Sequence, residues 1–156
     1  MPRGKRKEPD ALQSEFGGGA GERRRLLSGA HMRRRFSRLL VAAIDESKIL
    51  RVRAGARSQH RFVGIWAVVV ERRVFSRSWT QKPGGWYRTF LEDPLGTIEV
   101  GERQIAVRAV RARGQRTHDA IEQAYAKKYP TPGSLKYVRG FRTSRRRETT
   151  MEFLPR

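Results

Sequence analysis

Three short stretches of the chain combine cationic side chains with hydroxyl, imidazole or aromatic groups. They are Arg57-Ser58 with His60 and Arg61, then Arg77-Ser78-Trp79, then Trp86-Tyr87-Arg88. Guanidinium groups and hydroxyls bind phosphate through charge-assisted hydrogen bonds, and a flat aromatic side chain can stack on a nucleobase or an isoalloxazine ring. Together the stretches predict a site for a small anionic or aromatic ligand. Each also has a structural interpretation, with the arginines as surface charges and the tryptophans as core residues.

A fourth candidate is Lys128, which lies on a predicted helix at 117–128. Tyr125, Lys128 and Tyr129 are spaced i, i+3 and i+4 and therefore share one face of that helix. Two interpretations stay open. Either this face reaches the same ligand, or the tyrosines pack the helix onto its neighbours while Lys128 caps the helix end.

Other chemistries lack their residues in this sequence. There is no cysteine, and the three histidines, His31, His60 and His118, do not have the spacing of a zinc-binding helix. No nucleophile elbow, phosphate-binding loop or dinucleotide-binding glycine motif occurs, and no carboxylates pair for acid–base work. The sequence therefore predicts no metal site, favours neither a hydrolase nor a kinase, and leaves any catalytic residue unassigned.

The elements that must position these residues follow from the hydrophobic periodicity. The pattern predicts helices at 36–44, 117–128 and 135–141, a single helical turn at 86–91, and strands at 48–54, 62–70, 74–78, 97–100, 104–111 and 149–154. Leu39 is expected on the buried face of the first helix, and 62–70 reads as a central strand buried on both faces. Runs of adjacent strands with few helices favour an antiparallel α+β barrel over a doubly wound sheet.

Composition places this domain in the later part of the chain. Residues 1–31 hold seven basic and four acidic residues with few large apolar ones, so we expect a basic disordered leader, or an over-extended start with Met32 as the initiator. Residues 32–156 then form one domain. The absence of cysteine agrees with a reducing compartment, and no apolar run reaches the length of a membrane span. These features predict a cytoplasmic protein without membrane contact.

Several stretches resemble known proteins. PGGWYRTF at 83–90, Asp93-Pro94, TIEVG at 97–101 and IAVRA at 105–109 resemble the central part of deazaflavin-dependent nitroreductases. IWAVV at 65–69, VFSRS at 74–78, AYAKKY at 124–129 and TMEFLP at 150–155 are similar to a related bacterial family called domain of unknown function 2255. The resemblance extends over about residues 36–156.

The resemblance implies an antiparallel split β-barrel of about six strands with two or three short helices, of the kind found in pyridoxamine-phosphate oxidases. Such barrels are commonly homodimers that hold a cofactor at the subunit interface. For this chain the resemblance implies a homodimer with FMN or a deazaflavin, or a barrel that binds no cofactor. In a cofactor site, phosphate would meet Arg57, Ser58 and Arg61, with Arg77 and Ser78 opposite them. Trp86 and Tyr87 would cover the ring, and Arg88 would meet an anionic tail or substrate. The protein would then act as a small oxidoreductase.

Two alternatives come from the residues themselves. The chain has 35 basic and 15 acidic side chains, a net charge of +20, which also suits non-specific binding of nucleic acid. Against this, no recognition helix or RNA-binding motif is present. The second alternative is a barrel without ligand that serves as an interaction module.

Overall fold

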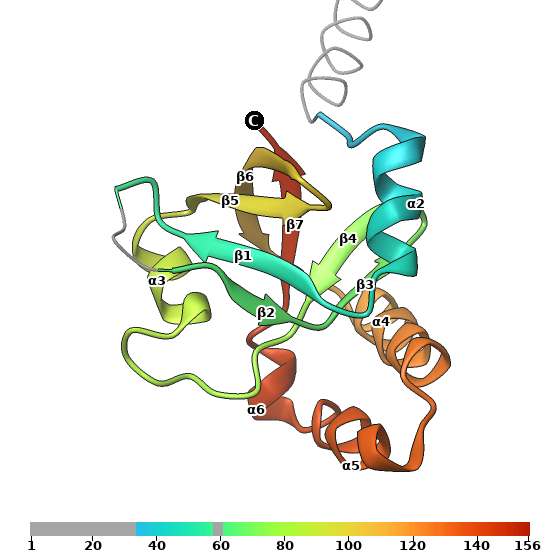
Figure 1. The fold of residues 1–156 in the computed structure, drawn as a ribbon. Helices are drawn as coiled ribbons and strands as arrows, with labels where there is room; N and C mark the ends of the chain where they lie inside the picture. Colours follow the sequence, from blue (N-terminus) through green and yellow to red (C-terminus); the bar gives the residue numbers. More distant parts are fainter. Residues whose placement is uncertain (1–33, 58–60) are drawn as a thin grey trace, which may run out of the picture. The chain divides into compact units, whose positions relative to one another are not determined.

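A nearly closed antiparallel barrel dominates the structure (Figure 1). The computed structural model describes residues 34–57 and 61–156, so the predicted leader, Ser58 and His60 lie outside the described residues. The strands are β1 Leu50–Ala54, β2 Val63–Ile65, β3 Ala67–Val70, β4 Arg73–Ser76, β5 Leu95–Val100, β6 Arg103–Arg111 and β7 Met151–Pro155. The helices are α2 Arg38–Glu46, α3 Trp86–Glu92, α4 Gln115–Lys128, α5 Pro132–Gly140 and α6 Ser144–Arg147. The predicted antiparallel α+β barrel is confirmed.

The barrel closes because one extended segment supplies both ends of the strand order. The order is β2-β1-β5-β6-β7-β4-β3, and β2 and β3 are separated in the chain only by Trp66. The predicted single strand at 62–70 is therefore two strands. Burial on both faces was wrong for Val63 and Gly64, which are exposed, because β2 stands at the end of the order and pairs with β1.

Two tight hairpins fix the register of the strands around this break. Between β3 and β4, Glu71 and Arg72 both have positive φ angles, 53° and 67°, which is the turn that matches the twist of paired strands. Between β5 and β6, Gly101 has a φ of 62° and supports the pairing of Val100 with Arg103. Both predicted hairpins are confirmed.

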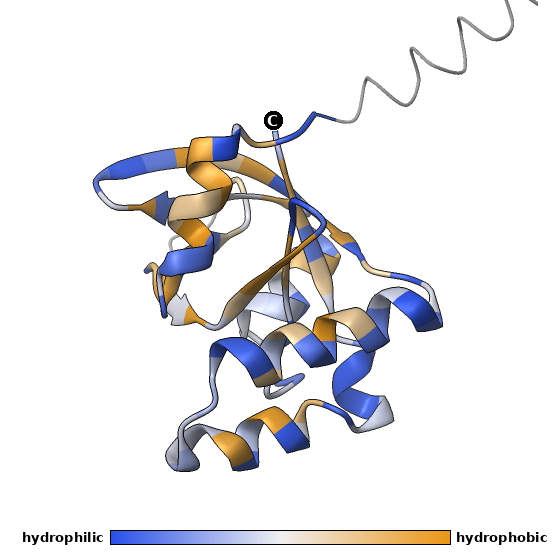
Figure 2. Ribbon diagram, turned by 90° about the vertical axis from the view of Figure 1, so that its right-hand side faces the viewer, coloured by the Kyte–Doolittle hydropathy of each residue, from blue (hydrophilic) through white to orange (hydrophobic). Residues whose placement is uncertain are grey.

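Apolar side chains gather in two cores, one on each side of β3 and β4. The first fills the barrel and includes Ile44, Val52, Val74, Ile98 and Val107. The second lies under α4 and α5 and includes Val68, Phe75, Ile121, Tyr125, Tyr129, Val138 and Phe141. Figure 2 shows the matching mixture of apolar and hydrophilic residues along α4 and α5. The second core positions α5, which contributes to the wall of the site described below, and α4, which supports that wall.

The first described helix, α2, packs on the barrel by a different face from the expected one. Ser37 caps it, since the Ser37 hydroxyl accepts a hydrogen bond from the Leu40 N–H at 3.2 Å. Leu40, Val41 and Ile44 are buried, whereas Leu39 is 85% exposed. The expectation for Leu39 was wrong because the buried face is centred one residue further along. No helix in the described part of the chain is long and apolar enough to cross a membrane.

Candidate functional site

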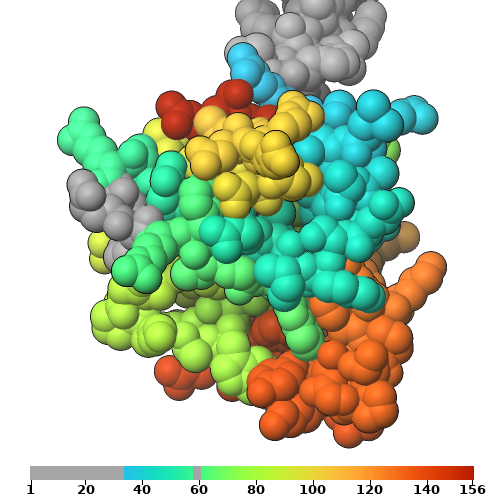
Figure 3. All heavy atoms as spheres, in the orientation of Figure 1, coloured from blue at the N-terminus to red at the C-terminus, as the bar shows by residue number. Residues whose placement is uncertain are grey.

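A cavity of about 350 Å³ opens between β2, the segment after β4, α3 and α5. In Figure 3 these segments, in green, lime and orange, meet on the face turned to the viewer. The residues around the cavity are Ile49, Gly64, Ile65, Trp66, Arg77, Trp79, Trp86, Tyr137 and Phe141. All three tryptophans of the chain are among them. The walls are thus mainly flat aromatic side chains.

The break between β2 and β3 places Trp66 at this cavity. The Trp66 carbonyl has left the strand ladder and accepts hydrogen bonds from the Ser76 hydroxyl at 2.8 Å and the Tyr125 hydroxyl at 2.7 Å. The indole stacks on Tyr129, with ring centroids 4.1 Å apart and planes 5° from parallel. Tyr125 on α4 and Tyr129 at its C-terminal cap therefore hold the backbone and the ring of Trp66, which keeps its position fixed.

Trp79 forms another part of the wall and is 38% exposed. The edge of its ring packs directly on the backbone of Gly140, where an added Cβ would lie 2.7 Å from Cζ3 of the indole. The Arg146 guanidinium carbon lies 3.5 Å from the centroid of the indole ring, and Tyr137 meets the indole edge to face at 4.9 Å. This wall depends on a residue without a side chain at position 140.

Trp86, the first residue of α3, separates the large cavity from a smaller one of about 90 Å³. The smaller cavity is walled by Val52, Ala54, Arg61, Val63, Gly84, Trp86 and Thr89. The structure thus brings two of the predicted site residues, Arg61 and Trp86, to one place. Arg61 is exposed at the far side of Trp86 from the aromatic cavity.

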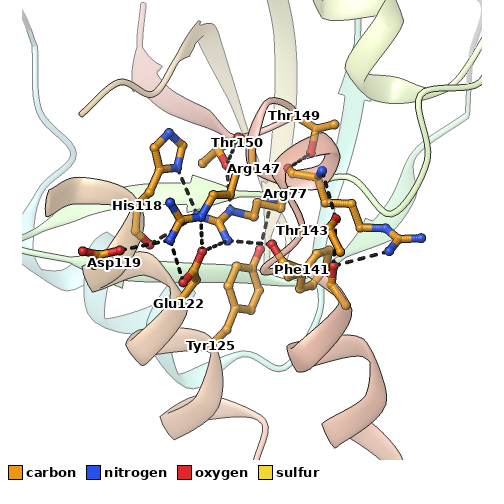
Figure 4. A network of polar contacts seen from close by, with 12 residues as sticks. Arg77, His118, Asp119, Glu122, Tyr125, Phe141, Thr143, Arg147, Thr149 and Thr150 are labelled. Carbon is orange, nitrogen blue, oxygen red and sulfur yellow. Dashed lines mark hydrogen bonds and ion pairs between the residues drawn. The ribbon is translucent and has the colours of Figure 1, made fainter. Parts of the chain in front are cut away.

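Arg77 reaches the cavity wall but is engaged within the protein (Figure 4). Its side chain is fully buried, and all five of its N–H donors have an acceptor. Nε donates to the Thr150 hydroxyl at 2.7 Å, Nη1 to Glu122 at 3.0 Å and to the Phe141 carbonyl at 2.9 Å, and Nη2 to Nδ1 and the carbonyl of His118. In this arrangement the guanidinium has no donor left for a phosphate. It joins α4, the C-terminal cap of α5 and the residue before β7 instead.

Glu122 is the acidic centre of that network. It accepts a bidentate pair of hydrogen bonds from Arg147 in addition to the bond from Arg77, and Asp119 accepts a further bond from Arg147 at 3.0 Å. Burial raises the pKa of Glu122, but the hydrogen bonds and positive charges of Arg147 and Arg77 outweigh it, so the net pKa is lowered. Burial and the same two arginines lower the pKa of His118.

Three other predicted site residues are bound to the protein backbone. The Ser78 hydroxyl donates to the Thr80 carbonyl at 2.6 Å, and the Tyr87 hydroxyl donates to the Glu148 carbonyl at 3.1 Å. Lys128 donates to the carbonyls of Ala67 at 2.7 Å and Ile44 at 3.2 Å, so it caps backbone rather than reaching the cavity. Burial lowers its pKa. Of the two interpretations left open, the packing of Tyr125 and Tyr129 matches the structure, but Lys128 caps carbonyls of α2 and β3 rather than the end of its own helix. Its assignment to a ligand site stays a prediction.

The remaining predicted residues lie on the surface. Arg57 is exposed, and its loop is held by Asp93, which accepts a hydrogen bond from the Ala56 N–H at 2.7 Å. Arg88 is exposed and donates to the Gln81 carbonyl at 3.2 Å. Neither lines the aromatic cavity. Ser58 lies outside the described residues.

Sequence reasoning missed Trp66, Tyr137 and Phe141 as site residues. Tyr125, Tyr129, Tyr137 and Phe141 repeat at intervals of four or eight residues across α4 and α5, and such spacing is the one signal that marks a shared aromatic face. Among residues 34–57 and 61–156, no three histidine, aspartate or glutamate side chains gather in a way that could hold a metal ion. The chemistry of the cavity is therefore that of aromatic walls with cationic groups beyond them.

Comparison with known families identifies one match. The family described as "Uncharacterized protein conserved in bacteria (DUF2255)" matches residues 40–153, most of the chain. The family resemblance stated from the sequence is therefore confirmed. No curated protein sequence matches the chain.

Solved structures share the fold at low sequence identity. A protein described as a candidate pyridoxamine 5'-phosphate oxidase from Listeria innocua has a TM-score of 0.51 and 8% identity, covering 76% of this chain and 90% of that one. An F420-H2-dependent reductase has a TM-score of 0.47 and 16% identity, with 69% and 93% covered. A FAD-binding protein from Mesorhizobium loti has a TM-score of 0.47 and 12% identity, with 77% and 88% covered. The first of these supports the split-barrel fold, as expected.

Proposed function

The chain belongs to the bacterial family DUF2255, and from that premise we propose that it binds a flavin-type cofactor, FMN or a deazaflavin, and acts as a small oxidoreductase. The observation that carries the proposal is the aromatic cavity, where three tryptophans wall one space on a split barrel. The Listeria innocua protein of the same fold is described as a candidate pyridoxamine 5'-phosphate oxidase. Its named substrate combines an aromatic ring with a phosphate group, which supports a ligand of that class here.

The residues present fit such a group by shape and by charge. A volume of about 350 Å³ lies within the range of about 300–1,000 Å³ that is usual for small-ligand sites. Apolar aromatic walls suit an isoalloxazine or deazaflavin ring. Arginines stand beyond these walls, the exposed Arg61 past Trp86, and the exposed Arg145 and half-buried Arg146 past Trp79. The ring of such a ligand would thus contact the apolar walls, and its anionic substituent would contact the arginines beyond them.

The chain's own part is to bind and to exclude water. Trp66 and Trp79 are immobilised by Tyr129 and Arg146, so they present rigid walls and lose little entropy on binding. Among the residues that line the cavity there is no carboxylate, imidazole or lysine, and its one cation, Arg77, is engaged within the protein. A bound flavin or deazaflavin supplies hydride chemistry itself, and the protein orients it.

The test uses the tryptophans as reporters, because all three face the ligand. The full chain is purified, its absorbance spectrum is recorded, and FMN and a deazaflavin are titrated while indole fluorescence is followed. We expect quenching that saturates at micromolar ligand. Stacking on an aromatic side chain is worth about 1–3 kcal/mol, so Trp86→Ala should weaken binding by about 5- to 150-fold.

A matched control comes from the same helix. Leu91 lies on α3, is 45% exposed and does not line the cavity, so Leu91→Ala should bind like the parent chain. A colourless preparation that binds neither FMN nor the deazaflavin at tens of micromolar would reject the proposal. Equal losses in Trp86→Ala and Leu91→Ala would also reject it, because the effect would then be one of folding.

A further inference from the structure

A second hollow, a groove of about 290 Å³, adjoins the aromatic cavity. It is lined by Trp79, Gln81, Thr143, Arg145, Arg146 and Thr149, which belong to the loop after β4 and to the segment around α6. Trp79 lines both the groove and the aromatic cavity. One indole is therefore the partition between an apolar space and a cationic one.

Arg146 is fixed in the wall of this groove. Its Nε donates to the Trp79 carbonyl at 2.9 Å, its Nη1 donates to the Gly140 carbonyl at 3.3 Å, and its guanidinium lies over the Trp79 ring. These contacts use two of the five N–H donors. The others have no hydrogen-bond acceptor among the described residues, so a planar cationic fork is already oriented for an incoming oxyanion.

The charges around α6 are unequally balanced. Arg147 is neutralised by Glu122 and Asp119. Arg145 and Arg146 form no ion pair within the described part of the chain, and the Arg145 side chain is exposed. The Arg145 carbonyl is held by the Gln81 amide at 3.1 Å, which fixes the backbone of this segment against the loop. The groove thus carries two uncompensated positive charges on a fixed backbone.

We propose that this groove is the subsite for the anionic tail of the ligand whose ring occupies the aromatic cavity, an inference that rests on the proposed function. The tail would carry phosphate or phosphodiester groups and would run from the cavity past Trp79 to Arg145 and Arg146. It would therefore leave the cavity past Trp79 rather than past Trp86 toward Arg61. Cofactors with such a tail, FMN and phosphorylated deazaflavins, are then bound in preference to the bare ring.

The experiment compares FMN with riboflavin, which has the same ring and no phosphate, on the full chain. Charge-assisted hydrogen bonds predict that FMN binds about tenfold more tightly than riboflavin. Arg145→Gln should bring the two dissociation constants closer together while leaving riboflavin binding unchanged. The double variant Arg145→Gln/Arg146→Gln should remove the remaining preference for FMN over riboflavin, although loss of the Arg146 contact to Trp79 also weakens binding of the ring itself. The Arg145 side chain makes no hydrogen bond, ion pair or ring contact to the described residues, so its single variant removes no interaction that holds Trp79. Arg139→Gln is the matched control, since Arg139 is an exposed arginine of α5 outside the groove.

Three results would overturn the subsite while leaving the proposed function standing. They are equal affinity for FMN and riboflavin, a preference unchanged by loss of Arg145 and Arg146, or a preference abolished by Arg61→Gln instead. Failure of both flavins to bind would count against the proposed function. In that case the melting temperature with inorganic pyrophosphate tests the groove. A rise in melting temperature that is lost in the double variant and kept in Arg139→Gln supports an anion site in the groove. No rise in the parent chain rejects such a site.

Discussion

At the scale of single residues, the buried ion pair of Arg77 and Glu122 is the most consequential polar feature. The Arg77 side chain is fully buried and that of Glu122 is 12% exposed, so each charge is stabilised by the other in a poorly solvated place. The Tyr125 hydroxyl completes the arrangement by accepting a hydrogen bond from the backbone N–H of Arg77 at 2.9 Å. Burial raises the pKa of Tyr125 to about 12, so it stays a neutral phenol that can also donate to the Trp66 carbonyl. The network thereby connects the ion pair to the cavity wall.

Replacement of Glu122 tests this network. Glu122→Ala leaves the Arg77 charge buried without its counterion and should lower the free energy of unfolding by about 3 kcal/mol. Glu122→Gln keeps an acceptor oxygen and should cost less. Urea unfolding at pH 7 measures both variants. Glu102→Gln is the control, because Glu102 is exposed in the β5–β6 turn and should change stability by no more than about 0.5 kcal/mol.

The same residue predicts a pH dependence with a definite sign. The pKa of Glu122 is lower in the folded protein than its ordinary value of 4.5, so its contribution is complete above pH 4.5 and is lost as pH falls through the folded value. The difference in unfolding free energy between the parent chain and Glu122→Gln should therefore shrink as pH falls below 4.5. A difference that stays constant from pH 7 to pH 3 would show that the charge of Glu122 is not what stabilises the fold.

At the scale of elements, α5 depends on its last residue. Gly140 ends the helix where the Trp79 ring packs against it, and a methyl group there would collide with the indole. Gly140→Ala should displace Trp79, lower the unfolding free energy by about 1–3 kcal/mol and shift indole fluorescence. Gly133→Ala is the control on the same helix, because no atom lies within 4 Å of an added Cβ there. That variant should be neutral or slightly stabilising, within about 1 kcal/mol. Equal effects of the two changes would contradict the packing described for Trp79.

Local pattern was sufficient for the elements whose causes are local. The β5–β6 hairpin and α4 follow from alternation and helical periodicity in their own segments, and the structure has both at nearly the predicted bounds. The break at Trp66 has no local signal in its apolar surroundings. It exists because Tyr125 and Ser76, which lie 59 and 10 residues away in sequence, satisfy the carbonyl that leaves the ladder.

The same distinction explains the site. Trp86 and Arg61 were predicted from short motifs, and the structure places both at the cavities. Arg77 was predicted as a phosphate ligand because its sequence neighbours are Ser78 and Trp79. Its actual partners come from residues 118–150, more than 40 positions later, so no nearby residue indicates its burial. The assignment of Arg77 to a phosphate site stays a prediction, and the described contacts leave its side chain no N–H donor free for a phosphate.

At the scale of the whole molecule, charge is the dominant property. Residues 32–156 keep +17 of the total +20, so the excess belongs to the domain rather than to the first 31 residues. Of its many arginines, four form ion pairs among the described residues: Arg51, Arg73, Arg77 and Arg147. The exposed cations are spread over strands, turns and helices rather than concentrated on one element. Non-specific binding of nucleic acid and assembly into a homodimer both stay predictions.

Such a charge excess predicts that the folded chain repels itself. Added NaCl shortens the screening length to about 10 Å at 0.1 M, so the melting temperature should rise by several degrees between 0.01 M and 0.3 M salt. Salt also weakens the attraction between Glu122 and its arginines, but only slightly, because partly buried pairs are screened less. That loss therefore reduces the rise in melting temperature only a little. Differential scanning fluorimetry across the salt series measures the effect, and a second series in pyrophosphate at matched ionic strength separates screening from binding.

Extra stabilisation in pyrophosphate that disappears in Arg145→Gln/Arg146→Gln would locate bound anion at the groove. A melting temperature that falls steadily with NaCl would mean that attractive ion pairs, not repulsion among the exposed arginines, dominate the electrostatics of this protein.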